Sequence, residues 1–161
     1  VPTRGILVTT GKMVRIDNNI FNRIKGCGIL IADDAKSWFE SGRVCNALIK
    51  NNVYRNSGGP FVRVAPENSE YAGAVHKNIA VTENEIFFEK NSNEIFSRIN
   101  PWKIKQNNII FEARCTDNIK FVGNRINGEE EECVIHTEKC GFADISDNSF
   151  AGRIVSKEFS S

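Results

Sequence analysis

Short apolar segments separated by polar turns recur along the whole chain. The pattern Φ-x-x-Asn-x-Φ, where Φ is an apolar residue, occurs five times, over residues 16–21, 49–54, 81–86, 121–126 and 145–150. The asparagines at its fourth position are spaced by 33, 32, 40 and 24 residues, and they are Asn19, Asn52, Asn84, Asn124 and Asn148. A constant unit interrupted by loops of unequal length is typical of a solenoid.

A second apolar segment precedes each asparagine motif. These segments cover residues 5–8, 28–31, 61–64, 109–112 and 133–136. One unit is therefore strand, loop, strand, asparagine turn and strand, and strands of about three to five residues are too short to form an independent sheet. We expect an all-β fold, a right-handed parallel β-helix of about five coils, in which 1–161 is a single segment.

The recurring asparagine has two expected roles in such a helix. At a bend, asparagine tolerates the left-handed backbone conformation. Its amide can also bond the equivalent amide of the next coil, forming an asparagine ladder. A β-sandwich would also contain many short strands, but it would not require asparagine at one equivalent place in each unit.

Composition supports the all-β prediction. The chain has 19 Ile, 12 Val and 19 Asn but only 3 Leu. β-branched residues favour strands, and asparagine favours turns over helix interiors. A helix bundle, a coiled coil, a helix-rich nucleotide-binding fold and a leucine-rich repeat are therefore excluded.

Charge and cysteine content narrow the possible partners. A formal net charge of +1 gives no electrostatic case for binding nucleic acid or an anionic membrane, and no apolar run reaches the roughly 18 residues of a membrane span. The five cysteines form no C-x-x-C pair, and there are only two histidines. We expect the cysteines to be small buried residues, although one disulfide is possible if the protein is exported. We predict no metal and no cofactor.

The first coil has no segment that would cover it. The chain begins at Val1 and enters an apolar strand at once. Because terminal repeats normally carry caps, we expect earlier coils to precede this chain. Preceding coils or a second copy of the chain are both possible partners for this end.

Two insertions carry candidate chemistry. The first, residues 32–44, holds Asp33, Asp34, Trp38 and Glu40. Glycoside hydrolysis needs two carboxyl groups, crowded carboxylates can divide acid and base roles, and tryptophan rings pack against sugars. The alternative is that the aspartates begin a turn and the aromatic residues fold back on the core.

The second insertion, residues 65–75, lies one coil further on. It contains Glu67, which would stack near Asp33, and it ends just before His76. For His76, two roles remain open at this point: a hydrogen bond that anchors the loop, or a contact with substrate.

Several of these segments resemble one enzyme family. The central string is Asp-Asp-x-x-x-Trp-Phe-Glu-Ser-Gly over residues 33–42, and the resemblance also includes residues 4–10, 48–52, 66–68 and 75–79. These strings resemble glycoside hydrolase family 110, the bacterial α-1,3-galactosidases, whose members are exported proteins far longer than this chain.

The resemblance implies that this chain is the C-terminal part of such an enzyme's β-helix and that its localisation is secreted or periplasmic. The implied reaction is the release of terminal α-1,3-linked galactose from a glycan with inversion. Asp33 and Asp34 match the family's aspartate pair and are the predicted catalytic residues, while Trp38, Glu40, Glu67 and His76 are predicted to bind the substrate. Whether the partner acid lies on other coils, which would leave the isolated chain inactive, stays open.

Two other functions remain possible. One is a non-catalytic β-helix that binds glycans or serves as a surface structural protein, which would bind sugar without turnover or not bind it. The other is a pectate-lyase-like polysaccharide lyase, which would depend on calcium held by clustered carboxylates.

Overall fold

The structure of the chain is a computed structural model that describes residues 3–33, 42–66, 74–88, 108–128 and 131–158. Within these residues every regular element is a strand. No helix among them is long and apolar enough to cross a membrane. Four predicted site residues, Asp34, Trp38, Glu40 and Glu67, lie outside the described residues.

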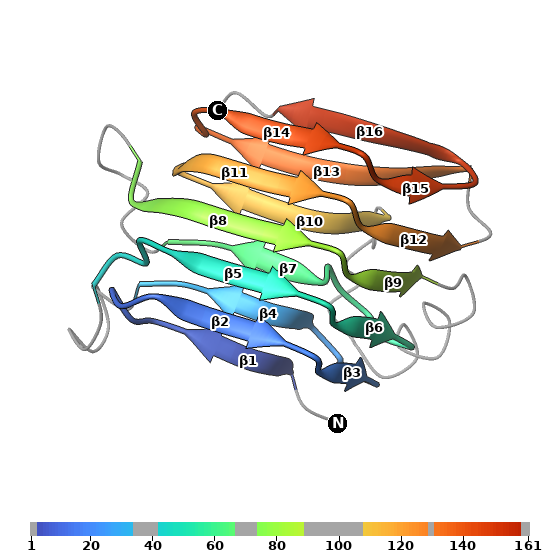
Figure 1. The fold of residues 1–161 in the computed structure, drawn as a ribbon, viewed down its shortest axis with the longest axis horizontal. Coiled ribbons are helices and arrows are strands. Elements are labelled where there is room, and N and C mark those ends of the chain that lie inside the picture. The colour runs from blue at the N-terminus through green and yellow to red at the C-terminus, as the bar shows by residue number, and fades with distance from the viewer. Residues whose placement is uncertain (1–2, 34–41, 67–73, 89–107, 129–130, 159–161) are drawn as a thin grey trace, which may run out of the picture.

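The strands form three parallel sheets (Figure 1). The first sheet has six strands: β1 (Arg4–Val8), β4 (Cys27–Ile31), β7 (Val62–Val64), β10 (Ile109–Arg114), β13 (Glu132–Glu138) and β16 (Arg153–Glu158). The second sheet has five: β2 (Val14–Asp17), β5 (Ala47–Lys50), β8 (His76–Thr82), β11 (Thr116–Val122) and β14 (Ala143–Ser146). The third sheet also has five: β3 (Ile20–Asn22), β6 (Val53–Arg55), β9 (Glu85–Phe88), β12 (Arg125–Gly128) and β15 (Ser149–Phe150).

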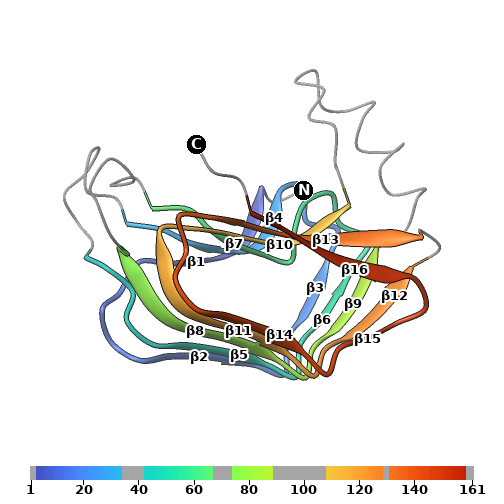
Figure 2. The same ribbon diagram turned by 90° about the horizontal axis from the view of Figure 1, so that it is seen from above.

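Each of five coils contributes one strand to each sheet, and β16 adds a sixth strand to the first sheet. Seen from above in Figure 2, the three sheets enclose a flattened ring. Neighbours in every sheet are three strands apart in the sequence and pair in parallel, for example β1 with β4 and β4 with β7. This is a parallel β-helix, and the predicted unit of three strands per coil is confirmed.

The core fills the inside of the ring, because equivalent apolar side chains stack from coil to coil. In the second sheet the inward row is Ile16, Ile49, Val81, Phe121 and Ile145. The three central members of this row are fully buried. Burying a side chain of this size contributes roughly 1.5–3 kcal/mol, so the stacked rows are the main source of stability.

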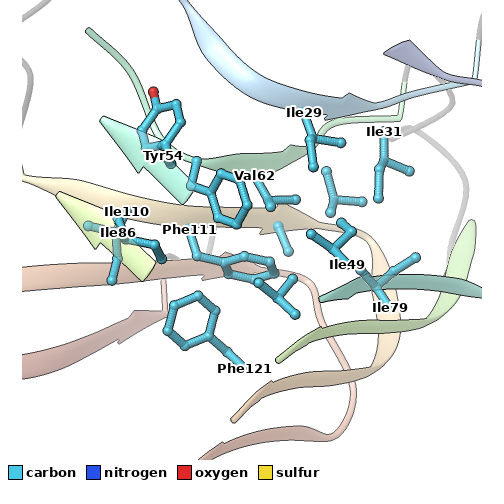
Figure 3. Close-up of a cluster of buried hydrophobic side chains, with 14 of the residues drawn as sticks. Ile29, Ile31, Ile49, Tyr54, Val62, Ile79, Ile86, Ile110, Phe111 and Phe121 are labelled. Atoms are coloured by element: carbon cyan, nitrogen blue, oxygen red, sulfur yellow. The ribbon is translucent and has the colours of Figure 1, made fainter. Parts of the chain in front are cut away.

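Aromatic rings lie among the buried aliphatic side chains of the core (Figure 3). Phe61 packs against Tyr54 with ring centroids 5.2 Å apart, and Phe111 packs against Phe121 at 5.5 Å. The Tyr54 hydroxyl donates a hydrogen bond of 2.6 Å to the Gly59 carbonyl. The buried ring therefore keeps its polar atom satisfied.

The predicted asparagine ladder is present. The ladder runs along Asn19, Asn52, Asn84, Asn124 and Asn148, and each of the first four donates from both its backbone N–H and its Nδ2 to the Oδ1 of the next. In addition, Nδ2 of Asn84 donates to the Ile49 carbonyl at 2.9 Å. The ladder thus satisfies polar backbone groups at the corner between the second and third sheets.

The predicted backbone conformation of these asparagines is wrong. The left-handed residue is the one before each ladder position, with φ values of 58°, 55°, 53°, 70° and 55° at Asn18, Asn51, Glu83, Gly123 and Asp147. The preceding residue makes the bend, and the ladder asparagine can then point its amide inward along the stack. The Asn residues at 18 and 51 fit the left-handed preference, while Glu83 adopts it because the coil requires it.

A second, shorter ladder was not predicted. Nδ2 of Asn78 donates to Oδ1 of Asn46 at 3.1 Å, and Nδ2 of Asn118 donates to Oδ1 of Asn78 at 2.7 Å. These residues are 32 and 40 positions apart, the same spacings that separate Asn52, Asn84 and Asn124. The repeated spacing was the sequence signal for this ladder.

Candidate functional site

Asp33 lies at the edge where the first strands of successive coils end. It follows β4 by two residues and is only 2% exposed. The backbone holds this edge in register: Ala32 N–H donates to the Val8 carbonyl at 3.1 Å, and Ala65 N–H donates to the Ile31 carbonyl at 2.9 Å. The stack therefore fixes the main chain immediately before Asp33.

His76 is the first residue of β8 and pairs with Thr116 of β11. Its side chain is fully buried. Val44 N–H donates to His76 Nδ1 at 2.9 Å, so the imidazole is bonded to the end of the first insertion. Contact between His76 and a substrate stays a prediction.

The two predicted site residues that the structure describes are electrostatically coupled. Burial lowers the pKa of His76, and the Asp33 carboxylate opposes that shift. Because burial has the larger effect, His76 is a neutral imidazole at neutral pH. The fold thus brings Asp33 and His76 together although 42 residues separate their positions in the chain.

A row of polar side chains lies on the outer face of the first sheet, and the sequence did not assign it. Arg63, Glu112 and His136 occupy equivalent positions on β7, β10 and β13. Arg63 Nε lies 2.8 Å from Glu112 Oε2, and His136 Nδ1 lies 3.7 Å from Glu112 Oε1. The signal for Arg63 was its place between two inward valines, since neighbouring strand residues face opposite ways.

Other features of the described residues lie away from Asp33. A hollow of about 420 Å³ is lined by residues such as Glu83, Arg125 and Asp147 at the asparagine corner. The described residues contain no group of three or more His, Cys, Asp or Glu side chains placed to hold a metal ion. All five cysteines are free thiols, and Cys27, Cys115 and Cys133 are buried, as the sequence predicted for small core residues.

Comparison with known proteins places the fold in a family. The model of the right handed beta helix region matches residues 4–155. The chain belongs to this family. The match confirms the predicted right-handed parallel β-helix, and it spans every coil that the structure describes.

Individual relatives of this β-helix carry related names. The chain is 49% identical to alpha-1,3-galactosidase A of Bacteroides thetaiotaomicron over 92 residues, which are 57% of the chain and 16% of that protein. It is 31% identical to alpha-1,3-galactosidase B of the same organism over 175 residues, covering 91% of the chain and 28% of that protein. Alpha-1,3-galactosidase A of Akkermansia muciniphila is 38% identical over 84 residues, 52% of the chain and 14% of that protein.

These similarities confirm the resemblance to the α-1,3-galactosidases that the strings around residues 33–42 indicated. The chain spans between about one seventh and one quarter of the length of these relatives. The right-handed β-helix described above therefore corresponds to one part of a larger architecture in those proteins.

Proposed function

We propose that this β-helix carries part of the active site of a glycoside hydrolase that releases terminal α-1,3-linked galactose from a glycan. The observation that carries the proposal is the buried carboxylate of Asp33 at an edge held in register by three coils, in a chain 49% identical to an alpha-1,3-galactosidase A over 92 residues. Asp33 and Asp34 are the proposed catalytic residues.

The proposed stereochemical course is inversion. An inverting glycosidase uses one carboxyl group as acid and another as base, roughly 6.5–9.5 Å apart, with water between the base and the sugar. In this proposal one of the two aspartates activates that water. Trp38, Glu40 and Glu67 are proposed to hold the galactose, and the partner acid lies in this chain or on preceding coils.

The position of Asp33 suits this role. A residue just beyond a strand end is placed by the rigid stack but is not part of the ladder, so its carboxylate can serve chemistry without weakening the fold. Function in solenoids concentrates in such loops on one face. We propose further that the natural protein is exported, as a glycan-degrading enzyme of this type would be.

The test is galactose release by the natural full-length protein and by the chain of residues 1–161. Both would be incubated with an α-1,3-galactosyl oligosaccharide, and the first anomer of the product would be identified by NMR. We expect β-galactose first. Asp33→Asn and Asp34→Asn are each expected to reduce turnover by at least 100-fold without unfolding the chain.

Asp147→Asn is the matched control. Asp147 is exposed at the asparagine corner, and asparagine tolerates its φ of 55°. Wild-type turnover in both Asp33→Asn and Asp34→Asn would reject the catalytic assignment. Sugar binding without turnover in the natural protein would favour a glycan-binding β-helix, and calcium-dependent formation of an unsaturated product would favour a lyase.

A further inference from the structure

His76 interacts with both ends of the first insertion. The insertion leaves β4 through Asp33 and returns to β5 through Val44, and these two residues flank residues 34–43 in the chain. His76 bonds Val44 directly and is electrostatically coupled to Asp33. Yet His76 itself belongs to the following coil, 32 residues beyond Val44.

Val44 is held at both of its backbone groups. Its N–H donates to His76 Nδ1 at 2.9 Å, and its carbonyl accepts from Lys77 N–H at 3.1 Å. Regular pairing of β5 with β8 begins only at Ala47. The imidazole therefore supplies an acceptor that the strand ladder does not provide at Val44, and a buried N–H left without an acceptor would be costly.

These contacts define the tautomer of His76. Because Nδ1 accepts a hydrogen bond from a backbone N–H, the proton of the neutral ring is on Nε2. Nε2 is buried and makes no hydrogen bond to any described residue. The ring that carries this buried donor also interacts electrostatically with the Asp33 carboxylate.

We propose that His76 is a positioning residue that fixes Asp33 and Val44 relative to each other, with Nδ1 accepting from Val44 and the Nε2–H oriented toward the Asp33 carboxylate. This role rests on the proposed function in one respect only: Asp33 must be a reacting group for the positioning to affect turnover. His76 does not touch the sugar in this proposal. It acts through the residues that it holds.

The expected kinetic effect falls on turnover. A displacement of about 1 Å at a catalytic group can cost about 100-fold in rate. His76→Ala removes both interactions, so we expect kcat to fall by about 10- to 100-fold while KM changes by less than about threefold. A residue that bound the sugar would instead raise KM.

Two conservative variants test the two ring nitrogens of His76 one at a time. The Oδ1 of His76→Asn takes the place of Nδ1 and can still accept from Val44, whereas the carboxamide of His76→Gln reaches the place of Nε2. We expect the Val44 amide to remain protected from hydrogen exchange in His76→Asn and to exchange at least tenfold faster in His76→Gln and His76→Ala. Thr116→Val is the control, because it removes one part-buried hydrogen bond beside His76, from Thr116 Oγ1 to the Arg114 carbonyl at 2.8 Å, and leaves Val44 bonded.

The role of His76 can be tested even if the proposed function is wrong. In wild-type protein, nitrogen chemical shifts should show the Nε2–H tautomer, and the Asp33 carboxyl carbon shift should move in His76→Asn and His76→Ala but not in Thr116→Val. If the protein releases no galactose, the proposed function fails while these two spectroscopic results still decide the role of His76. An Nδ1–H tautomer, an unchanged Asp33 shift, or wild-type kcat in folded His76→Ala of an active enzyme would overturn the inference.

Discussion

Asn52 donates two hydrogen bonds to a single oxygen of Asn84, from its backbone N–H at 2.9 Å and from its Nδ2 at 3.0 Å. Asn84 in turn donates the same pair to Asn124, both at 3.0 Å. Both Asn52 and Asn84 are buried. The ladder therefore joins successive coils through side chains as well as through the strands on either side.

Asn84→Ala is expected to destabilise the chain by about 2–4 kcal/mol, because it leaves two donors of Asn52 and the Ile49 carbonyl without their partner. Asn19→Ala at the exposed first position is the matched control and should cost less than about 1 kcal/mol. Urea unfolding of both variants checks this, and equal losses would contradict a cooperative buried ladder.

The row on the first sheet leads to a second prediction. The Glu112 side chain is only 19% exposed and lies 2.8 Å from Arg63 and 3.7 Å from His136. Glu112→Gln keeps the shape but removes the charge, so we expect a loss of about 1 kcal/mol, reduced by added salt. Asp17→Asn is the control, because the Arg15 side chain of that pair is 61% exposed. If Glu112→Gln loses no more stability than Asp17→Asn, the charge of Glu112 does not stabilise the fold.

Stability should depend on the protonation of His76. Burial lowers the pKa of His76 below the value of 6.5 that an unfolded chain would show. In that interval the unfolded state binds more protons, so stability is fully present above pH 6.5 and falls as the pH drops toward the pKa of the folded state. Urea unfolding at pH 7.5 and pH 5 should show this fall in wild type and a smaller one in His76→Asn. Identical pH dependence of the two proteins would contradict the burial of a neutral imidazole.

The cysteines should differ in reactivity. Burial, with a smaller contribution from Glu132, raises the pKa of Cys133 to about 12, and burial also raises the pKa of Cys27. Since the thiolate is the reactive form, alkylation at pH 8 should modify half-buried Cys45 well before Cys133 or Cys27. Mass spectrometry of the modified peptides checks the order, and urea should remove the difference. Early modification of Cys133 in the folded chain would contradict its placement.

The sequence predicted the coil organisation well because the signals were periodic. The upstream apolar segments correspond to β1, β4, β7, β10 and β13, and the asparagines spaced from Asn19 to Asn148 form the predicted ladder. The prediction of the backbone conformation at the bend was wrong, because the residue before each asparagine, and not the asparagine itself, adopts positive φ. Propensity favours asparagine at such a position, but the geometry of the coil decides which residue turns.

The candidate site was likewise predicted from the sequence only in part. Asp33 was selected because the string over residues 33–42 resembles the α-1,3-galactosidases, and its catalytic role stays a prediction. The ring orientation of His76 was not readable, because Val44 approaches it from the preceding coil. The partners of Arg63 were equally hidden, since Glu112 is 49 residues away and only the parallel register brings the two together.

The sequence alone therefore determined which segments become strands, that they stack as coils, and which residue types face the core. These properties follow from the alternation of apolar and polar residues within each strand and from a sequence motif that recurs in every coil. Only the tertiary structure decided which residues interact: His76 with Val44 and Asp33, Glu112 with Arg63 and His136, and Asn78 with Asn46 and Asn118 in a second ladder. Those neighbours are set by register across loops of unequal length, and register depends on the packing of all coils at once.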